Sequence, residues 1–248
     1  MRILILGATG NSGLALTRMA LARGLDVTAF VRDSEKLQSL LGPDAASPRL
    51  TVRTGSLGDL QALVTAMAGQ DAVINAAGNA TVDTNFVPMV HGVIAAAEQV
   101  LGPGGKLWLF GGAAALDVPG HVLRAADLPL IPKIYKQHIH TLARVRETAL
   151  DWSMLCPGPM VSSATGKPTQ GLRISSETWP VQGPGPGRLF LTIRVLKAFK
   201  DRMPEMIVTY QDAAQVILDN LAPDSPFSGK RVGLALPPGR TGTKPGGY

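Results

Sequence analysis

The chain has 248 residues, of which 45% are hydrophobic and 17% are charged, so it is long enough to bury one core and too apolar for wholesale disorder. One cysteine excludes an internal disulfide framework and any metal site built from a cysteine cluster. The 24 basic and 18 acidic residues leave a net charge of +6, which suits nucleic acid, a membrane surface or a phosphorylated small molecule.

Short runs rich in Val, Ile and Leu alternate with segments of helical periodicity in the first half of the chain. Strands are predicted at residues 2–6, 26–31, 50–53, 72–76 and 106–110, and helices at residues 11–23, 34–41, 57–67 and 86–100. This alternation is typical of an α/β protein with a doubly wound parallel sheet of the Rossmann type.

The alternation of strands and helices becomes less regular in the second half, where glycine and proline are frequent. We expect a loop at residues 113–132, a helical stretch at 133–149, strands at 152–156, 172–175 and 231–236, and helices at 189–200 and 210–221. Thr209 and Asp212 have the spacing of a capping box at the start of the last helix. We predict a single domain over residues 1–248, with a small C-terminal substrate-side region in which residues 163–205 form an insertion and residues 237–248 a loose tail.

The most specific motif is the glycine-rich segment GATGNSG at residues 7–13, which follows the first strand and opens the first helix. Glycine at Gly7 and Gly10 permits a tight turn and lets backbone N–H groups approach a pyrophosphate, and Gly13 permits close packing of the helix on the strand. The N-terminus of the helix adds partial positive charge. The segment predicts a dinucleotide site, against the alternative of a purely structural turn.

An arginine follows the second strand, where dinucleotide-binding folds select between cofactors. Arg32 lies 19 residues after Gly13, at a place where a NAD site would use an acidic residue to bind the ribose 2′-hydroxyl. An arginine suits the 2′-phosphate of NADP instead. We therefore predict NADPH as the cofactor, the alternative being a surface arginine, and we expect Asp33 to point away or to cap the next helix.

These motifs resemble those of the atypical short-chain dehydrogenase/reductase group, which includes NmrA-like proteins, biliverdin reductase B and NADH-flavin reductase-like proteins. The similarity rests on GATG at 7–10, VRD at 31–33, GQDAVI at 69–74, FGGA at 110–113, and LDWS at 150–153 leading to Pro157. It covers residues 1–160 and resumes at residues 207–221.

The resemblance implies a role for each segment that follows a strand. The pyrophosphate would be held by Gly7, Thr9, Gly10, Asn11 and Ser12, and the 2′-phosphate by Arg32. The adenosine ribose would lie beside Ala76, Ala77 and Gly78, and the nicotinamide ribose above Gly111 and Gly112. The nicotinamide ring would be flanked by Pro157, Gly158, Pro159 and Met160. All these positions fall at carboxyl ends of strands, where an open parallel sheet binds its ligands.

The catalytic triad of conventional short-chain dehydrogenases is absent from the sequence. Gly112 stands at the position of their serine or threonine, and Tyr135 is followed four residues later by Ile139 rather than by a lysine. The polar candidates on the helix that faces the nicotinamide in relatives are Tyr135, Lys136 and His138, the alternative being a solvated helix surface.

Without the catalytic triad, the protein is expected to reduce acceptors that need no proton from a protein side chain. Flavins and quinones are electron-poor and can take a proton from water, so their reduction needs less help from the protein. We predict an NADPH-dependent oxidoreductase that transfers hydride to a flavin, a quinone or a similar planar acceptor. The alternative is a non-catalytic NADP-sensing regulator like some NmrA-like proteins, and the missing Tyr–Lys pair disfavours a sugar epimerase.

We expect a small-molecule acceptor as the partner, and neither nucleic acid nor a membrane. The densest basic stretch, residues 188–202, fits a solvated helix face or a patch that faces phosphate or a partner. No apolar run approaches the length of a membrane span, and glycines interrupt the N-terminal run, so we expect a soluble cytoplasmic protein. His138 and His140 do not share a helix face, which disfavours a metal site. Cys156 is expected to be a buried packing residue.

Overall fold

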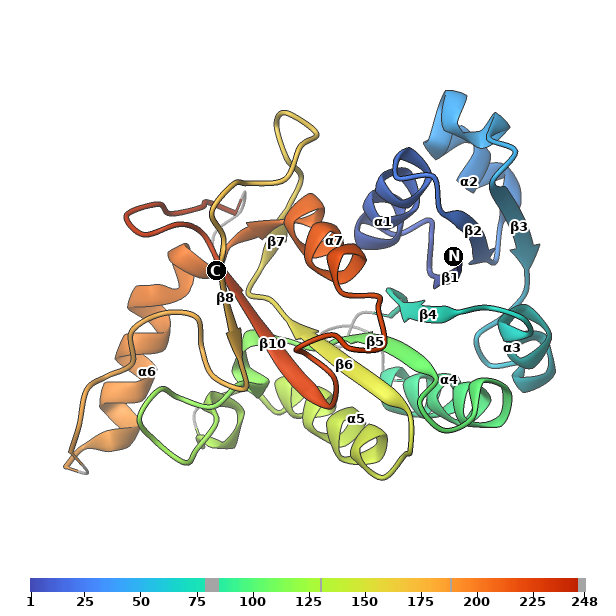
Figure 1. The fold of residues 1–248 in the computed structure, drawn as a ribbon. Helices are drawn as coiled ribbons and strands as arrows, with labels where there is room; N and C mark the ends of the chain where they lie inside the picture. Colours follow the sequence, from blue (N-terminus) through green and yellow to red (C-terminus); the bar gives the residue numbers. More distant parts are fainter. Residues whose placement is uncertain (79–84, 130, 188, 245–248) are drawn as a thin grey trace.

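Eight strands form one sheet in the computed structural model, which describes residues 1–78, 85–129, 131–187 and 189–244 (Figure 1). The strands are β1 (Arg2–Leu6), β2 (Asp26–Val31), β3 (Leu50–Thr54), β4 (Ala72–Asn75), β5 (Lys106–Phe110), β6 (Asp151–Cys156), β8 (Arg173–Ser176) and β10 (Lys230–Ala235). Their order is β3-β2-β1-β4-β5-β6-β10-β8, and all neighbours pair in parallel except the antiparallel pair β8 and β10. This is the doubly wound Rossmann-type sheet that the sequence predicts.

Helices cover both faces of the sheet, because successive side chains of a strand point to opposite sides. The helices are α1 (Asn11–Ala22), α2 (Ser34–Leu41), α3 (Leu60–Met67), α4 (Phe86–Leu101), α5 (Gln137–Arg146), α6 (Leu191–Arg202) and α7 (Tyr210–Asp219). Ile3 and Ile5 belong to the core shared with α1, α2 and α7, whereas Leu4 and Leu6 belong to the core shared with α3, α4 and α5. Figure 1 shows α1 and α7 above the sheet and α4 and α5 below it. Within the described residues, no helix combines the length and apolarity needed to cross a membrane.

Capping side chains set the starts of several helices. α3 begins at Leu60 rather than at residue 57, because the Asp59 carboxylate caps it with a 3.0 Å hydrogen bond from a first-turn N–H. Asp33 caps α2 in the same way at 2.9 Å, which is one of the two roles expected for it. The predicted capping box of α7 is confirmed, since Thr209 and Asp212 each accept a hydrogen bond from the other's backbone N–H.

The second half of the chain is irregular, as its glycine and proline content predicts. The helical stretch predicted at residues 133–149 divides into a 3-10 helix at Lys133–Lys136 and α5, which ends at Arg146. Two short strands that the sequence analysis missed, β7 (Met160–Val161) and β9 (Val208–Thr209), pair in parallel as a separate small sheet. Strands of two residues leave too short a pattern to be recognised in a sequence.

The region expected to be a substrate-side insertion builds part of the fold. Within residues 163–205, β8 extends the main sheet, and α6 packs on the core where Trp179 and Phe199 bring their ring centroids to 5.1 Å. The expected loose tail also differs, because residues 237–244 bend back along the 3-10 helix Met203–Met206 with backbone hydrogen bonds. Residues 245–248 of that tail lie outside the described residues.

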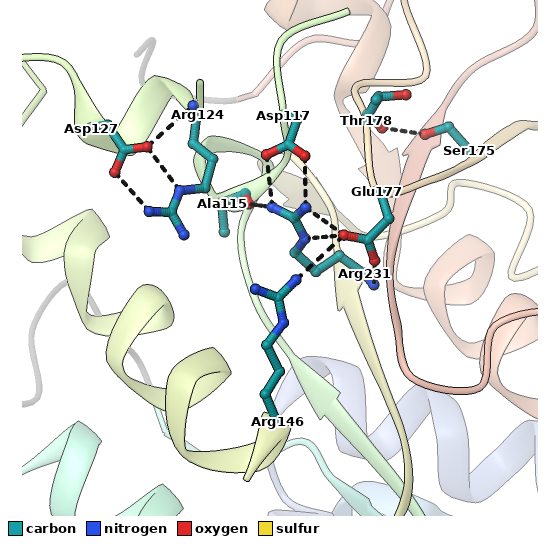
Figure 2. Close-up of polar contacts among 9 residues, drawn as sticks. All are labelled: Ala115, Asp117, Arg124, Asp127, Arg146, Ser175, Glu177, Thr178 and Arg231. Carbon is teal, nitrogen blue, oxygen red and sulfur yellow. Dashed lines mark hydrogen bonds and ion pairs between the residues drawn. The ribbon is translucent and has the colours of Figure 1, made fainter. Parts of the chain in front are cut away.

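A buried arginine ties β10 to the loops beside it (Figure 2). Arg231 is 4% exposed, and its guanidinium donates to both carboxylate oxygens of Asp117, to Glu177 and to the carbonyl of Ala115. Arg146, at the end of α5, forms a further ion pair with Glu177 at 3.5 Å. The cluster therefore joins the last strand of the parallel array to the segment after β5, the turn after β8 and α5.

Candidate functional site

The three glycines that follow β1 have three different environments. Gly7 has a φ of +79°, and a Cβ there would lie 2.7 Å from Ala77 Cα, so only glycine fits this turn beside the end of β4. A Cβ on Gly13 would lie 2.2 Å from Gly7 O, so Gly13 lets α1 start against the turn. A Cβ on Gly10 would approach only Gly7 O, at 3.3 Å. The backbone therefore constrains the residue at position 10 less than it constrains Gly7 and Gly13.

A cavity of about 1250 Å³ opens beside these glycines. Its walls include the residues that directly follow β1, β2, β3, β4 and β5, all at the carboxyl ends of parallel strands. The strand order reverses beside β1, and a doubly wound sheet binds its ligands in the crevice at such a reversal. The cavity is therefore where the fold class places a ligand, and it is large enough for an extended one.

Most residues predicted to hold the cofactor line this cavity together with one catalytic candidate. They are Gly7, Thr9, Gly10, Asn11, Ser12, Arg32, Ala76, Ala77, Gly78, Gly111, Met160 and the candidate His138. The structure thus brings together segments from six separate parts of the sequence.

Six other predicted residues lie outside the cavity lining. They are Gly13, Gly112, Pro157, Gly158, Pro159 and the candidate Tyr135. Gly158 serves packing, because a Cβ there would lie 2.5 Å from Met206 O. The carbonyl of Pro157 accepts a hydrogen bond from the backbone of Ala113 at 2.8 Å. Tyr135 is 38% exposed in the 3-10 helix before α5. No described residue within 163–205 lines the cavity either.

The charges around the cavity suit a ligand with several phosphates. α1 begins with neither a capping side chain nor an acidic residue in its first turn, so its positive end is left for an anion. Arg32 and Lys244 line the cavity, and neither forms a hydrogen bond or ion pair with any residue that the structure describes. The described lining contains no aspartate or glutamate. The glycine turn, the helix end and two unpaired cations together fit a dinucleotide.

His138 lies in the cavity wall beside the segment that follows β5. Its ring meets Phe86 edge-on, with centroids 5.2 Å apart, and a Cβ on Gly112 would lie 3.2 Å from its Cδ2 atom. Its Nδ1 atom is buried and has no hydrogen-bond partner among the described residues. Burial lowers the pKa of His138 to about 4, so the ring is neutral at physiological pH and can donate from one nitrogen and accept at the other.

Several residues of the cavity were missed by the sequence analysis. The loop after β3 contributes Gly55 and Gly58, α4 contributes Phe86 and Met89, and α7 contributes Tyr210. Asn11 Nδ2 donates to Tyr210 Oη at 3.1 Å, across 199 residues of sequence. Two glycines, Gly55 and Gly58, that directly follow a predicted strand were a usable signal for the β3 loop. Neither Phe86 nor Tyr210 carries such a signal, because each is an ordinary residue at a helix start.

Cys156 is a packing residue, as predicted. It is buried in β6, and a Cβ on Gly111 would lie 2.7 Å from its sulfur. Burial raises the pKa of the Cys156 thiol to about 12, so the reactive thiolate is not formed at neutral pH.

Comparison with known proteins agrees with this geometry. The family model for NAD(P)H-binding proteins matches residues 7–183 of the chain, beginning at the glycine turn. Oxidoreductase ptaF of Pestalotiopsis fici is 38% identical over 73 residues, which make up 29% of this chain and 28% of the length of that protein.

Solved structures share the fold over nearly the whole chain. A short-chain dehydrogenase/reductase of Veillonella parvula in complex with NADP has a TM-score of 0.68 and 17% identity, with 99% of this chain and 98% of that chain covered. A proposed NADH-flavin reductase of Streptococcus pneumoniae has a TM-score of 0.69 and 21% identity, with 95% and 99% covered. At these identities the similarity is one of fold.

Proposed function

The chain belongs to the NAD(P)H-binding family, and from this we propose that it is an NADPH-dependent oxidoreductase that transfers hydride to a flavin, a quinone or a similar planar acceptor. The oxidoreductase name of the Pestalotiopsis relative and the flavin reductase name of the Streptococcus structure support this class of reaction. The preference for NADPH and the kind of acceptor are argued from the residues of the cavity.

The observation that carries the cofactor proposal is the unpaired guanidinium of Arg32. Arg32 follows β2, lines the cavity and has no ion-pair partner among the described residues. A 2′-phosphate would supply that partner through charge-assisted hydrogen bonds, whereas the 2′-hydroxyl of NADH offers no charge. The backbone at Gly7, Gly10 and the start of α1 would hold the pyrophosphate.

The acceptor proposal rests on the lack of a hydroxyl group at position 112, where conventional short-chain dehydrogenases carry a serine or threonine. When bound, NADPH supplies a hydride from its nicotinamide ring. Gly112 offers no hydroxyl, and the ring of His138 packs over the place where such a side chain would lie. His138, neutral and partly buried, lies against Gly112 in the cavity wall, and it would orient an acceptor by a hydrogen bond. An acceptor that takes its proton from water suits this wall.

The test is a panel of acceptors with NADPH, monitored by loss of absorbance of the reduced nicotinamide. FMN, riboflavin and a soluble quinone should be reduced, whereas simple ketones and aldehydes should not. Reduction of ketones but not of flavins or quinones would contradict the acceptor class. Tight NADPH binding with no turnover on any acceptor would replace this proposal with that of an NADP-sensing regulator.

A further inference from the structure

The C-terminal segment of the chain is docked on the body of the protein by its backbone. Gly242 N donates to Pro204 O at 2.8 Å, and Leu236 N donates to Glu205 O at the same distance. A Cβ on Gly242 would lie 2.7 Å from Ile207 O, so the close approach of the two backbones requires glycine there. The segment thus has a defined path where the sequence predicts a loose tail.

Side chains anchor the start of this segment. Arg173 Nε donates to the carbonyl of Leu236 at 2.7 Å, and its guanidinium also pairs with Glu205 at 2.7 Å. Glu205 pairs in addition with Arg202 at 2.8 Å. The segment that leaves β10 is therefore held at its start by hydrogen bonds to the backbone of Leu236, whose partners Arg173 and Glu205 are themselves ion-paired, and further along by Gly242.

This path brings an unpaired cation to the cofactor cavity. Lys244, two residues after Gly242, lines the same cavity as the glycine turn and makes no hydrogen bond or ion pair with any described residue. The described lining offers it no carboxylate. Tyr210 lies three residues after Ile207 and lines the same cavity. Its hydroxyl oxygen accepts a hydrogen bond from Asn11 in the glycine-rich segment, so the Tyr210 O–H remains free to donate.

We propose that residues 237–244 form a strap that carries Lys244 to the pyrophosphate of the bound dinucleotide, opposite the glycine turn, with Tyr210 as a neighbouring donor. The proposal rests on the proposed function only in requiring a dinucleotide in this cavity. It assigns the two cations different phosphates: Arg32 binds the 2′-phosphate that only NADPH carries, and Lys244 binds the pyrophosphate that NADPH and NADH share.

The experiment compares dissociation constants for NADPH and NADH, measured by fluorescence titration of the full-length protein. Lys244→Gln should weaken both cofactors by about tenfold, since each loses one charge-assisted contact with a phosphate. The salt dependence of binding should also become shallower, because one fewer cation faces the ligand. Arg240→Gln is the matched control, because it removes a cation from the same strap at a position outside the cavity lining. It should leave both constants unchanged.

A second variant tests the docking rather than the charge. Gly242→Val keeps Lys244 but cannot maintain the close approach to Ile207. It should therefore weaken the binding of NADPH and NADH as Lys244→Gln does. The thermal unfolding midpoint of the cofactor-free variant shows whether the fold itself is intact. Unchanged binding in Lys244→Gln overturns the inference while leaving the proposed function intact. A loss confined to NADPH assigns Lys244 to the 2′-phosphate and also overturns it. Wild-type protein that binds neither dinucleotide overturns the proposed function, and this inference with it.

Discussion

His138 shows how burial changes the chemistry of one side chain. The sequence leaves it as either a cofactor-facing residue or part of a solvated helix surface, and the structure puts its ring against Phe86 and Gly112 in the cavity wall. Its neighbour Tyr135, three positions earlier, remains outside the lining. Whether the 3-10 helix or α5 faces the cavity depends on how the two helices pack against the rest of the fold. The residues of the segment itself do not determine this packing.

The lowered pKa of His138 predicts a pH-dependent stability. The ring titrates near 6.5 when unfolded and near 4 when folded, so the unfolded state binds more protons between these values. This contribution is complete above pH 6.5 and is lost as the pH falls toward 4. Lowering the pH from 7.5 to 5 should reduce the free energy of unfolding by about 2 kcal/mol through this residue.

Urea denaturation of the wild type and of His138→Gln at the two pH values measures this contribution. Glutamine does not titrate, so the variant should lose less stability on acidification than the wild type does. An equal loss in both proteins would show that the imidazole titrates normally in the folded state.

The position of Arg32 predicts a preference for NADPH over NADH. A charge-assisted pair with a phosphate contributes roughly 1.5 to 3 kcal/mol, which corresponds to about ten- to a hundredfold in affinity. Arg32→Asp should weaken NADPH by at least that factor, because repulsion is added to the lost contact, and should leave NADH little changed. Titration of both cofactors against both proteins gives a ratio of ratios that removes general damage to the fold. Equal binding of NADH and NADPH by the wild type would contradict the assignment.

At the level of elements, the turn between β1 and α1 separates folding from binding. Gly7 and Gly13 are required by the backbone around them, whereas a Cβ on Gly10 would make one tight contact, 3.3 Å from Gly7 O, and Gly10 lines the cavity. The three glycines of the motif therefore have different roles. Gly7 and Gly13 are needed for folding, whereas Gly10 lies where a larger side chain would enter the cavity.

Gly10→Val should weaken NADPH binding by more than tenfold with little loss of stability, because the branched side chain would fill the space next to the turn. Gly10→Ala should have a smaller effect on binding, since its single methyl group approaches only Gly7 O. The measurements are NADPH titration and thermal unfolding of the two variants. A folded Gly10→Val protein that binds NADPH as tightly as the wild type would refute the position of the pyrophosphate.

The Arg231 cluster makes the second prediction at this level (Figure 2). Arg231→Ala removes the buried cation that lies between the carboxylates of Asp117 and Glu177 and leaves only Arg146, 3.5 Å from Glu177, as a cation of the cluster. The variant should reduce the free energy of unfolding by about 1 to 3 kcal/mol, because the carboxylates lose several hydrogen bonds from a charged donor. Arg124, paired with Asp127 at 2.8 Å on the surface nearby, is the matched control, and Arg124→Ala should cost less than about 1 kcal/mol. Chemical denaturation measures the free energy of unfolding of both variants. Equal losses in the two variants would contradict the stabilising role assigned to Arg231.

At the level of the whole molecule, the cavity is assembled from residues spread between Gly7 and Lys244. A ligand that filled the cavity would contact the ends of neighbouring strands, the start of α7 and Lys244, so we expect binding to require the complete fold. NADPH at 100 times its dissociation constant should stabilise the protein by about 2.7 kcal/mol and raise the unfolding midpoint by about 5 to 10 °C. Thermal denaturation with and without NADPH checks this, and Gly10→Val at the same NADPH concentration should show a smaller rise. No shift in the wild type would mean that the cavity does not bind the cofactor.

The sequence by itself determined the β-α-β order, most element boundaries, the glycine turn and the place of Arg32 after β2. These features are local, because hydrophobic periodicity, caps and turns depend on neighbours within a few residues. The sequence analysis also expected the acceptor side of the site in residues 163–205 and a loose tail after them. The first expectation came from the family resemblance, which does not cover these residues, and the second came from the position of the segment at the end of the chain. Neither argument says where the segment lies in the fold.

Only the tertiary structure decided that β8 and α6 of that region join the sheet and core, and that the C-terminal strap, Tyr210 and His138 reach the cavity instead. The hydrogen bond between Asn11 and Tyr210 spans 199 residues. The docking of Gly242 on Ile207 depends on where the fold places the start of β9 and the end of β10. Such contacts exist only once the sheet is assembled, because strand order rather than sequence distance sets which loop ends become neighbours.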